Sequence, residues 1–170
     1  MRNFFLLVVF LVPAALSAQT PEENLAKLNI KIPAVPDAIG SYVDAVRIGN
    51  LLYLSGKGPR QANGEYIKGK LGAELTVEQG NAAARQTAIN QLAVLNKTLG
   101  SINKVKRIVK VNGYVNSADS FADQPKVING FSDLMIAVFG EAGKHARTAI
   151  GTNSLPMNMA VEVEMIVEVE

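Results

Sequence analysis

The side chains that could carry chemistry in this chain are mostly charged ones. Its 170 residues include no cysteine and a single histidine, His145. The lack of cysteine excludes thiol nucleophiles, zinc–thiolate sites and iron–sulfur clusters, and one histidine argues against a catalytic triad or a histidine-rich metal site. We therefore expect no metal and no organic cofactor. Any reaction would rest on guanidinium groups, which hold carboxylates, and on carboxylates, which can act as general bases toward water.

The charge balance gives a second limit on function. The formal net charge is +2, whereas a dedicated nucleic-acid surface needs a clear basic excess or a stripe of basic and aromatic residues. We therefore expect no nucleic-acid partner. The length fits one domain.

The elements that must position the reactive groups follow from local patterns. Residues 42–48 and 51–55 predict a β-hairpin around Gly49-Asn50, and residues 65–67 predict a further short strand. Thr76 and Gln79 fit a capping box that opens a helix ending before Gly100. The later elements are a strand at 106–115, a helix at 125–139, a short strand from 147 to about 151 and a final strand at 159–170.

The final strand alternates strictly between apolar residues and glutamates, with Ile166 as the exception. This pattern is typical of an antiparallel strand with one face in solvent, so most of these glutamates need no function. The element order predicts an α+β sandwich in which two helices cover one face of a largely antiparallel sheet. The uncovered face favours self-association.

The N-terminal segment predicts a targeting signal rather than part of the folded domain. Residues 1–18 have a cationic start, an apolar run and small residues at the end, as a secretory signal peptide does. The apolar run is too short to cross a membrane comfortably. We expect cleavage after Ala18 or Ser17 and export to the periplasm or medium, with no stable membrane association afterwards. Residues 19–38 form a proline-interrupted lead-in without regular structure, and residues 39–170 form the single domain.

Three sequence blocks resemble the YjgF/Rid family, the reactive intermediate deaminases, whose members are also named endoribonucleases and translation inhibitors. The blocks are VRIGNLLYLSG at 46–56, HARTAI at 145–150, and Leu155-Pro156 leading into VEVE at 161–164. The most specific part is the ordered set Arg147, Leu155-Pro156 and Glu162. The resemblance implies a chorismate-mutase-like fold and a homotrimer with clefts between subunits. It also implies cofactor-free hydrolysis of 2-imino acids and their enamines to 2-keto acids and ammonia.

The resemblance also implies roles for individual residues. Arg147 would hold the substrate carboxylate and Glu162 would activate the attacking water, and we expect the two to be paired on adjacent closing strands. The remaining substrate-binding residues implied by the resemblance are Tyr42, Ser55, Gly56, Asn129 and Ala149.

Two departures from the family pattern leave the substrate open. Lys57 replaces a glutamine of the common pattern, and Gly151 stands where many members carry an acidic residue. The alternative function is a non-catalytic trimer that binds small carboxylates or other metabolites in the same cleft. A ribonuclease would rest on family naming alone, and the near-neutral charge argues against it.

Overall fold

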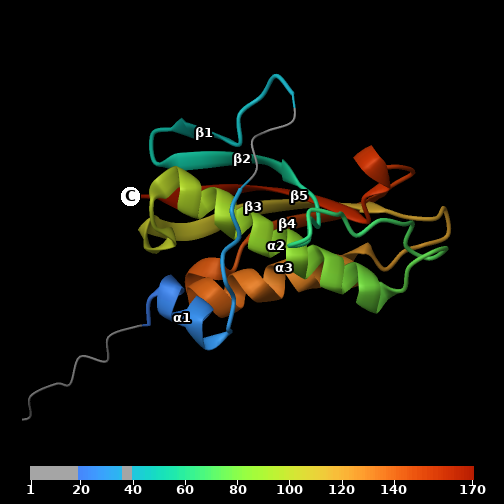
Figure 1. Ribbon diagram of the computed structural model, residues 1–170, viewed down its shortest axis with the longest axis horizontal. Coiled ribbons are helices and arrows are strands. Elements are labelled where there is room, and N and C mark those ends of the chain that lie inside the picture. The colour runs from blue at the N-terminus through green and yellow to red at the C-terminus, as the bar shows by residue number, and fades with distance from the viewer. Residues whose placement is uncertain (1–18, 36–39) are drawn as a thin grey trace, which may run out of the picture.

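The computed structural model describes residues 19–35 and 40–170, so the predicted signal peptide lies outside the described residues. Figure 1 shows helices and strands folded into one α+β unit. The helices are α1 (Pro21–Lys27), α2 (Val77–Leu99) and α3 (Gln124–Phe139), and the strands are β1 (Ala45–Ile48), β2 (Leu51–Lys57), β3 (Val105–Asn116), β4 (Ala146–Thr152) and β5 (Val161–Val169). Short 3-10 turns lie at Ile102–Lys104, Gly140–Gly143 and Pro156–Asn158.

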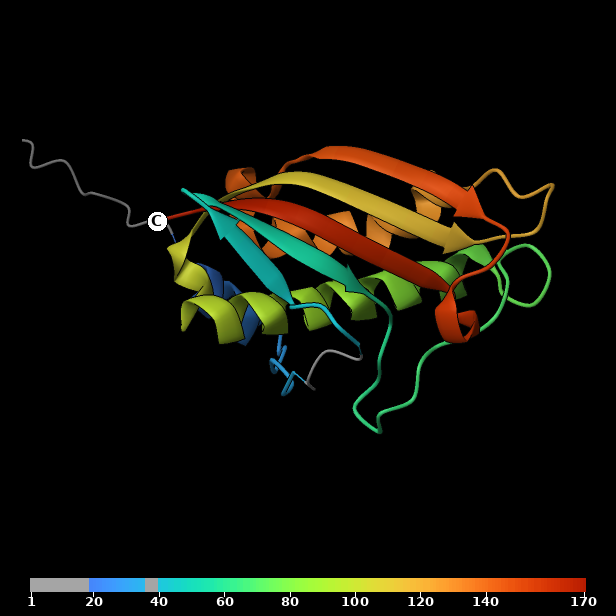
Figure 2. The same ribbon diagram turned by 90° about the horizontal axis from the view of Figure 1, so that it is seen from above.

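The five strands form one mixed sheet in the order β1-β2-β5-β3-β4. All neighbouring pairs are antiparallel except β3 and β4, which run parallel and are connected through α3. Figure 2 shows the sheet as one layer and the two long helices as a second layer against one of its faces. The chorismate-mutase-like α+β fold is therefore confirmed, and β3–β4 is the parallel exception to the expected antiparallel sheet.

The helix boundaries follow from their caps. Thr76 and Gln79 form the predicted capping box at the start of α2, and Gly100 ends the helix with φ of 77°, a conformation that glycine adopts without strain. α2 packs against β2 and β5, and α3 packs against β3 and β4. The apolar face of β5 packs toward the helices and forms part of the core. Its five inward residues are each 2% exposed or less: Val161, Val163, Met165, Val167 and Val169.

Three predictions about the chain before α2 were wrong in detail. β1 begins at Ala45 rather than at residue 42, and β2 continues to Lys57 through an irregularity after Leu54. The short strand expected at 65–67 is instead a loop with isolated bridges. The amide of Ile67 donates to the carbonyl of Pro59, but Pro59 has no N–H to return, so this pairing cannot extend into a ladder.

The lead-in also contains structure that the proline pattern does not predict. Pro21 occupies the first turn of α1, where its missing N–H costs nothing, and Thr20 and Glu23 form a capping box. Leu25 is buried, and the Asn24 side-chain amide donates to the Val138 carbonyl at 2.9 Å. The expectation of no regular structure was therefore wrong for this segment, which is fastened to α3.

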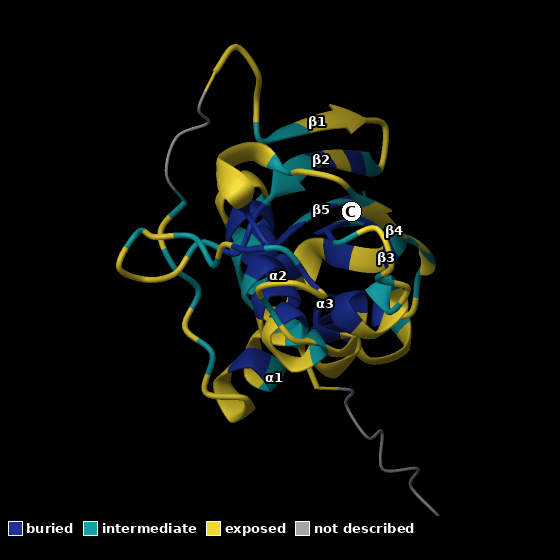
Figure 3. Ribbon diagram, turned by 90° about the vertical axis from the view of Figure 1, so that its right-hand side faces the viewer, coloured by how far each residue is buried: buried dark blue, intermediate teal, exposed yellow. Residues whose placement is uncertain are grey.

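The sheet face away from the helices remains open. Exposed residues dominate β1, while the interior between the helices and the sheet is buried (Figure 3). Val46, Tyr53 and Ile150 face this open side and are 51%, 40% and 46% exposed. A face with this many exposed apolar side chains is typical of a surface that binds another protein.

Over the described residues, no helix is long and apolar enough to cross a membrane.

Candidate functional site

Arg147 lies on β4 and is held in place by residues of α3 and its first turn. Its Nη1 donates to Asn129 Oδ1 at 2.9 Å and to Ser132 Oγ at 3.1 Å, and its Nη2 donates to the Pro125 carbonyl at 3.4 Å. A guanidinium has five N–H groups, so three are used by the described residues, and one on Nε and one on Nη2 are left. Nε and Nη2 share one edge of the guanidinium, the edge from which an arginine can meet both oxygens of a carboxylate.

His145 supports this arrangement from behind Ser132. Its Nδ1 lies 2.6 Å from the Gly143 carbonyl, which can only accept, so Nδ1 carries the proton. In the neutral ring, Nε2 then accepts the Ser132 hydroxyl at 3.0 Å, which leaves Ser132 Oγ as the acceptor for Arg147. Burial lowers the pKa of His145, and the Arg147 charge lowers it further, although the bond to Gly143 opposes both. The neutral ring that this chain of hydrogen bonds requires is therefore favoured.

Glu162 lies on β5 and lines a cavity of about 920 Å³. Within the described part of the chain, its carboxylate makes no hydrogen bond or ion pair. The neighbouring Glu164, by contrast, accepts from Asn112 at 3.0 Å and from Tyr114 at 3.1 Å. Burial raises the pKa of Glu162, the Glu164 charge raises it further, and Lys57 opposes both. A half-buried carboxylate without a partner, beside a cavity, is suited to accept a proton from bound water.

Gly56 is the reason that the Glu162 carboxylate fits where it does. A Cβ at Gly56 would lie 2.1 Å from Glu162 Oε1, so only glycine allows this close approach. Tyr42 and Ser55 line the same cavity. The Ser55 hydroxyl, however, already donates to the Val43 carbonyl at 2.7 Å, which makes it part of the wall.

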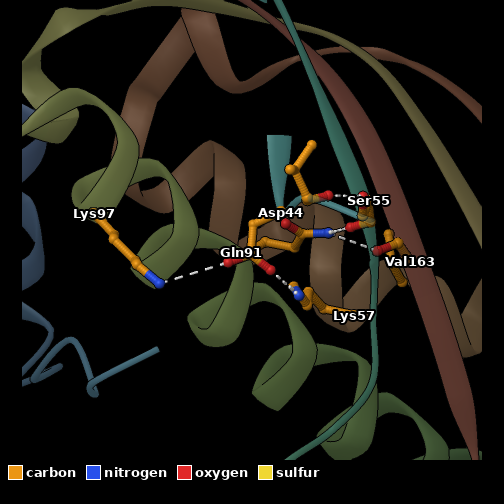
Figure 4. A network of polar contacts seen from close by, with 7 residues as sticks. Asp44, Ser55, Lys57, Gln91, Lys97 and Val163 are labelled. Carbon is orange, nitrogen blue, oxygen red and sulfur yellow. Dashed lines mark hydrogen bonds and ion pairs between the residues drawn. The ribbon is translucent and has the colours of Figure 1, made fainter. Parts of the chain in front are cut away.

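A polar network fastens this end of β2 to α2 (Figure 4). The Gln91 amide donates to the Ser55 carbonyl at 3.0 Å and to the Val163 carbonyl at 2.7 Å, where the β2–β5 ladder is irregular. Asp44 pairs with Lys57 at 2.6 Å and with Lys97 at 3.7 Å. The Lys57 ammonium also lies 6.0 Å from the centre of the Tyr42 ring. The departure at Lys57 therefore places an ion-paired cation in the cavity wall.

The structure separates the two residues that were expected to be paired. β3 lies between β4 and β5, so Arg147 and Glu162 are not on adjacent strands. They also face opposite sides of the sheet. Arg147 aligns with Val111, which is buried toward the helices, whereas Glu162 aligns with Tyr114 on the open side. The expectation that Arg147 and Glu162 lie on adjacent strands was therefore wrong.

The predicted site residues instead form two clusters. The first cluster comprises Arg147 and Asn129, with Ala149 two residues further on the same face of β4. The second cluster comprises Glu162, Tyr42, Ser55 and Gly56 around the cavity.

Sequence reasoning missed the residues that hold these clusters in place. Ser132 and Gln91 were both overlooked, although each is a polar residue inside the apolar stripe of its helix, and both are buried. A buried polar side chain must satisfy its hydrogen bonds, so its position in the stripe is a usable signal. His145 is half-buried beside Ser132 and supports the same cluster.

Among residues 19–35 and 40–170, no group of three His, Asp or Glu side chains could hold a metal ion.

Comparison with known proteins gives consistent matches over nearly the whole chain. Residues 22–169 match a family model described as "YjgF/chorismate_mutase-like, putative endoribonuclease". Protein TCP17 of Trypanosoma cruzi is 46% identical over 146 residues, covering 85% of this chain and 91% of that protein. A 2-iminobutanoate/2-iminopropanoate deaminase of Dermatophagoides farinae is 33% identical, covering 83% and 95%. The crystal structure of Atu1372 from Agrobacterium tumefaciens, of unknown function, superposes with a TM-score of 0.82 at 38% identity, covering 89% and 94%.

Proposed function

The chain belongs to the YjgF/Rid family, and on that premise we propose that it is a hydrolytic deaminase of 2-imino acids and their enamine tautomers. The products would be 2-keto acids and ammonia. The observation that carries this proposal is the pair of complementary clusters. One presents an anchored guanidinium with two N–H groups left for a carboxylate, and the other presents a half-buried carboxylate without a partner beside a cavity.

The proposed reaction needs only these groups and water. Arg147 holds the substrate carboxylate, and Glu162 accepts a proton from water while the water oxygen bonds to the imine carbon. The nitrogen then takes up a proton, the C–N bond breaks, and ammonia leaves as the carbonyl forms. One water is consumed, and nothing is oxidised or reduced. The imine is already electrophilic, so orientation and charge balance supply most of the catalysis.

The positions of the two clusters support a site shared between subunits. Within one chain, Arg147 and Glu162 face opposite sides of the sheet with β3 between them. A second copy must therefore bring its Arg147 to the first copy's Glu162. The open sheet face, with Val46, Tyr53 and Ile150 exposed, offers the surface for such an assembly. We propose the homotrimer that the family resemblance implies.

The test is the release of keto acid or ammonia from a 2-imino acid that an amino-acid oxidase generates in the assay. We expect the wild type to accelerate release over buffer, and Arg147→Ala and Glu162→Gln to fall to the buffer rate. Glu168→Gln is the matched control, because Glu168 shares the strand and face of Glu162 but does not line the cavity. Equal small accelerations by the wild type and Arg147→Ala would refute the deaminase proposal.

The second candidate function is a non-catalytic trimer that binds small carboxylates in the same cleft. The anchored guanidinium favours it, because carboxylate binding by Arg147 does not need Glu162. This function predicts saturable binding of 2-keto acids that Arg147→Ala abolishes, without turnover. Isothermal titration beside the turnover assay separates the two functions.

Export remains part of the proposal and needs its own measurement. N-terminal sequencing of the protein recovered from the producing cells would locate the cleavage site. A mature N-terminus at residue 18 or 19 is expected, and recovery of intact residues 1–18 from the cytoplasm would contradict export.

A further inference from the structure

The cavity beside Glu162 is much larger than a small imino acid requires. Its volume of about 920 Å³ lies at the upper end of the range of roughly 300–1,000 Å³ typical of pockets for drug-sized ligands. An imino acid with a one- or two-carbon side chain has only a handful of heavy atoms. Most of this space would therefore stay empty if such an acid were the preferred substrate.

The cavity is lined by several segments besides the strand that carries Glu162. They include Ile89 and Ala93 of α2, Pro33 and Val35 of the N-terminal segment, and Tyr66 of the loop that follows β2. Because Glu162 lines the same cavity, a ligand beside it shares one space with these residues.

We propose that the part of the cavity beside α2, the N-terminal segment and Tyr66 holds the substrate's side chain, and that the preferred substrates are 2-imino acids with large, mainly apolar side chains. The inference rests on the proposed function. The imine carbon carries three groups: the nitrogen, the carboxylate and the side chain. The carboxylate is assigned to Arg147 of the neighbouring copy, and the nitrogen must stay beside the water that Glu162 activates. Only the side chain is left to enter the cavity.

Several polar groups of the walls are already occupied within the protein. The Asn90 amide donates to the carbonyls of Gly58 at 2.9 Å and Arg60 at 3.0 Å, and the Gln86 amide also donates to the Arg60 carbonyl at 3.0 Å. These donors fasten the loop to α2 and are not available to a ligand. The Lys57 ammonium is already paired with Asp44.

Ala93 lies where α2 borders the cavity. It is only 3% exposed, yet it lies outside the cluster of packed core residues and lines the cavity. A larger side chain at this position would therefore extend into the cavity rather than into the core.

The first experiment compares substrates with the wild-type protein. Imino acids are generated by an amino-acid oxidase from alanine, leucine, phenylalanine and glutamate, and hydrolysis is followed by competition with semicarbazide. We expect kcat/KM for the leucine- and phenylalanine-derived imino acids to exceed that for the alanine-derived one by at least about tenfold, because each methylene in an apolar pocket contributes severalfold or more. A preference for the glutamate-derived acid would overturn the proposal and point to Arg60, whose guanidinium has no carboxylate partner among the described residues.

The second experiment fills the cavity in steps with Ala93→Val and Ala93→Leu. We expect Ala93→Leu to lower kcat/KM for the phenylalanine-derived imino acid at least about tenfold and to leave the alanine-derived one within about twofold. Ala82→Leu is the control, because Ala82 is an exposed alanine of the same helix outside the cavity. Thermal unfolding of each variant identifies any loss of folding, and Ala93→Val is the milder test if Ala93→Leu unfolds.

The outcomes separate this inference from the proposed function. Acceleration of small imino acids alone, unchanged by Ala93→Leu, would overturn the side-chain pocket while leaving the deaminase intact. No acceleration with any imino acid would overturn the proposed function itself.

Discussion

Replacing Arg147 with lysine keeps the positive charge but removes the planar set of N–H groups. In the structure, Asn129, Ser132 and the Pro125 carbonyl use three of the five N–H groups and fix the plane of the guanidinium. A lysine ammonium has three donors on a flexible stem and no preferred plane. It therefore cannot keep the anchors to α3 and also present two parallel N–H groups to a substrate carboxylate.

The expected loss follows from the number of hydrogen bonds. Lysine can replace at most one of the two bonds to the carboxylate, and a hydrogen bond to a charged group contributes about 1.5–3 kcal/mol. Since about 1.4 kcal/mol corresponds to a factor of ten, Arg147→Lys should lower kcat/KM by roughly 10- to 150-fold. The affinity for a 2-keto acid should fall by a similar factor, because the same bonds hold the product.

The assay is the imino-acid hydrolysis described above, combined with titration of a 2-keto acid by calorimetry. Arg85→Lys is the control, because Arg85 is an exposed arginine of α2 outside the site. Both measurements should be unchanged by the control. If Arg147→Lys stays within about twofold of the wild type in both measurements, a charge alone is sufficient and the bidentate geometry is not used.

Four further substitutions test the rest of the site. Because Lys57 opposes and Glu164 reinforces the raised pKa of Glu162, Lys57→Met should move the acidic limb of the kcat/KM–pH profile to higher pH. Glu164→Gln should move it to lower pH, and shifts in the same direction would contradict Glu162 as the base. Gly56→Ala places a methyl where Glu162 Oε1 now lies. It should lower kcat about 100-fold in steady-state assays, and an unchanged kcat would show that the carboxylate position is unimportant. Ser132→Ala leaves a buried hydrogen-bonding group unsatisfied, which should cost about 1–3 kcal/mol, or roughly 2–12 °C in calorimetry. An unchanged melting temperature together with an unchanged KM would exclude Ser132 as an anchor of Arg147.

The long elements of the fold could be predicted from the sequence because their signals are local. The capping box at Thr76, the glycine after Leu99 and the alternation along β5 each lie within a few residues of the feature that they determine. The errors arose where a residue far away in the sequence determines the local structure. β2 continues past Gly56 because Gln91, from α2, satisfies the carbonyls at the irregularity, and no pattern within residues 51–57 contains that information.

The sequence offers candidate site residues but not their arrangement in space. The resemblance to the YjgF/Rid family points to Arg147 and Glu162 as candidates, yet it does not show that β3 lies between their strands. Strand order in a mixed sheet depends on the parallel β3–β4 crossover, which is a property of packing rather than of local sequence. The helix position of Ser132 could have indicated a buried polar partner for an arginine, but not which arginine.

The placement of Arg147 and Glu162 on opposite faces of the sheet makes genetic complementation possible. In a site shared between copies, Arg147→Ala and Glu162→Gln subunits are each inactive alone, but an interface between one of each can hold both intact residues. Unfolding and refolding an equal mixture should restore about a quarter of the wild-type activity, since the two contributing subunits are drawn at random into a symmetric assembly. Mixtures that remain inactive would place both residues of each site in the same subunit. If each site takes Arg147 from one copy and Glu162 from another, activity depends on the total protein concentration, because a single subunit then has no complete site.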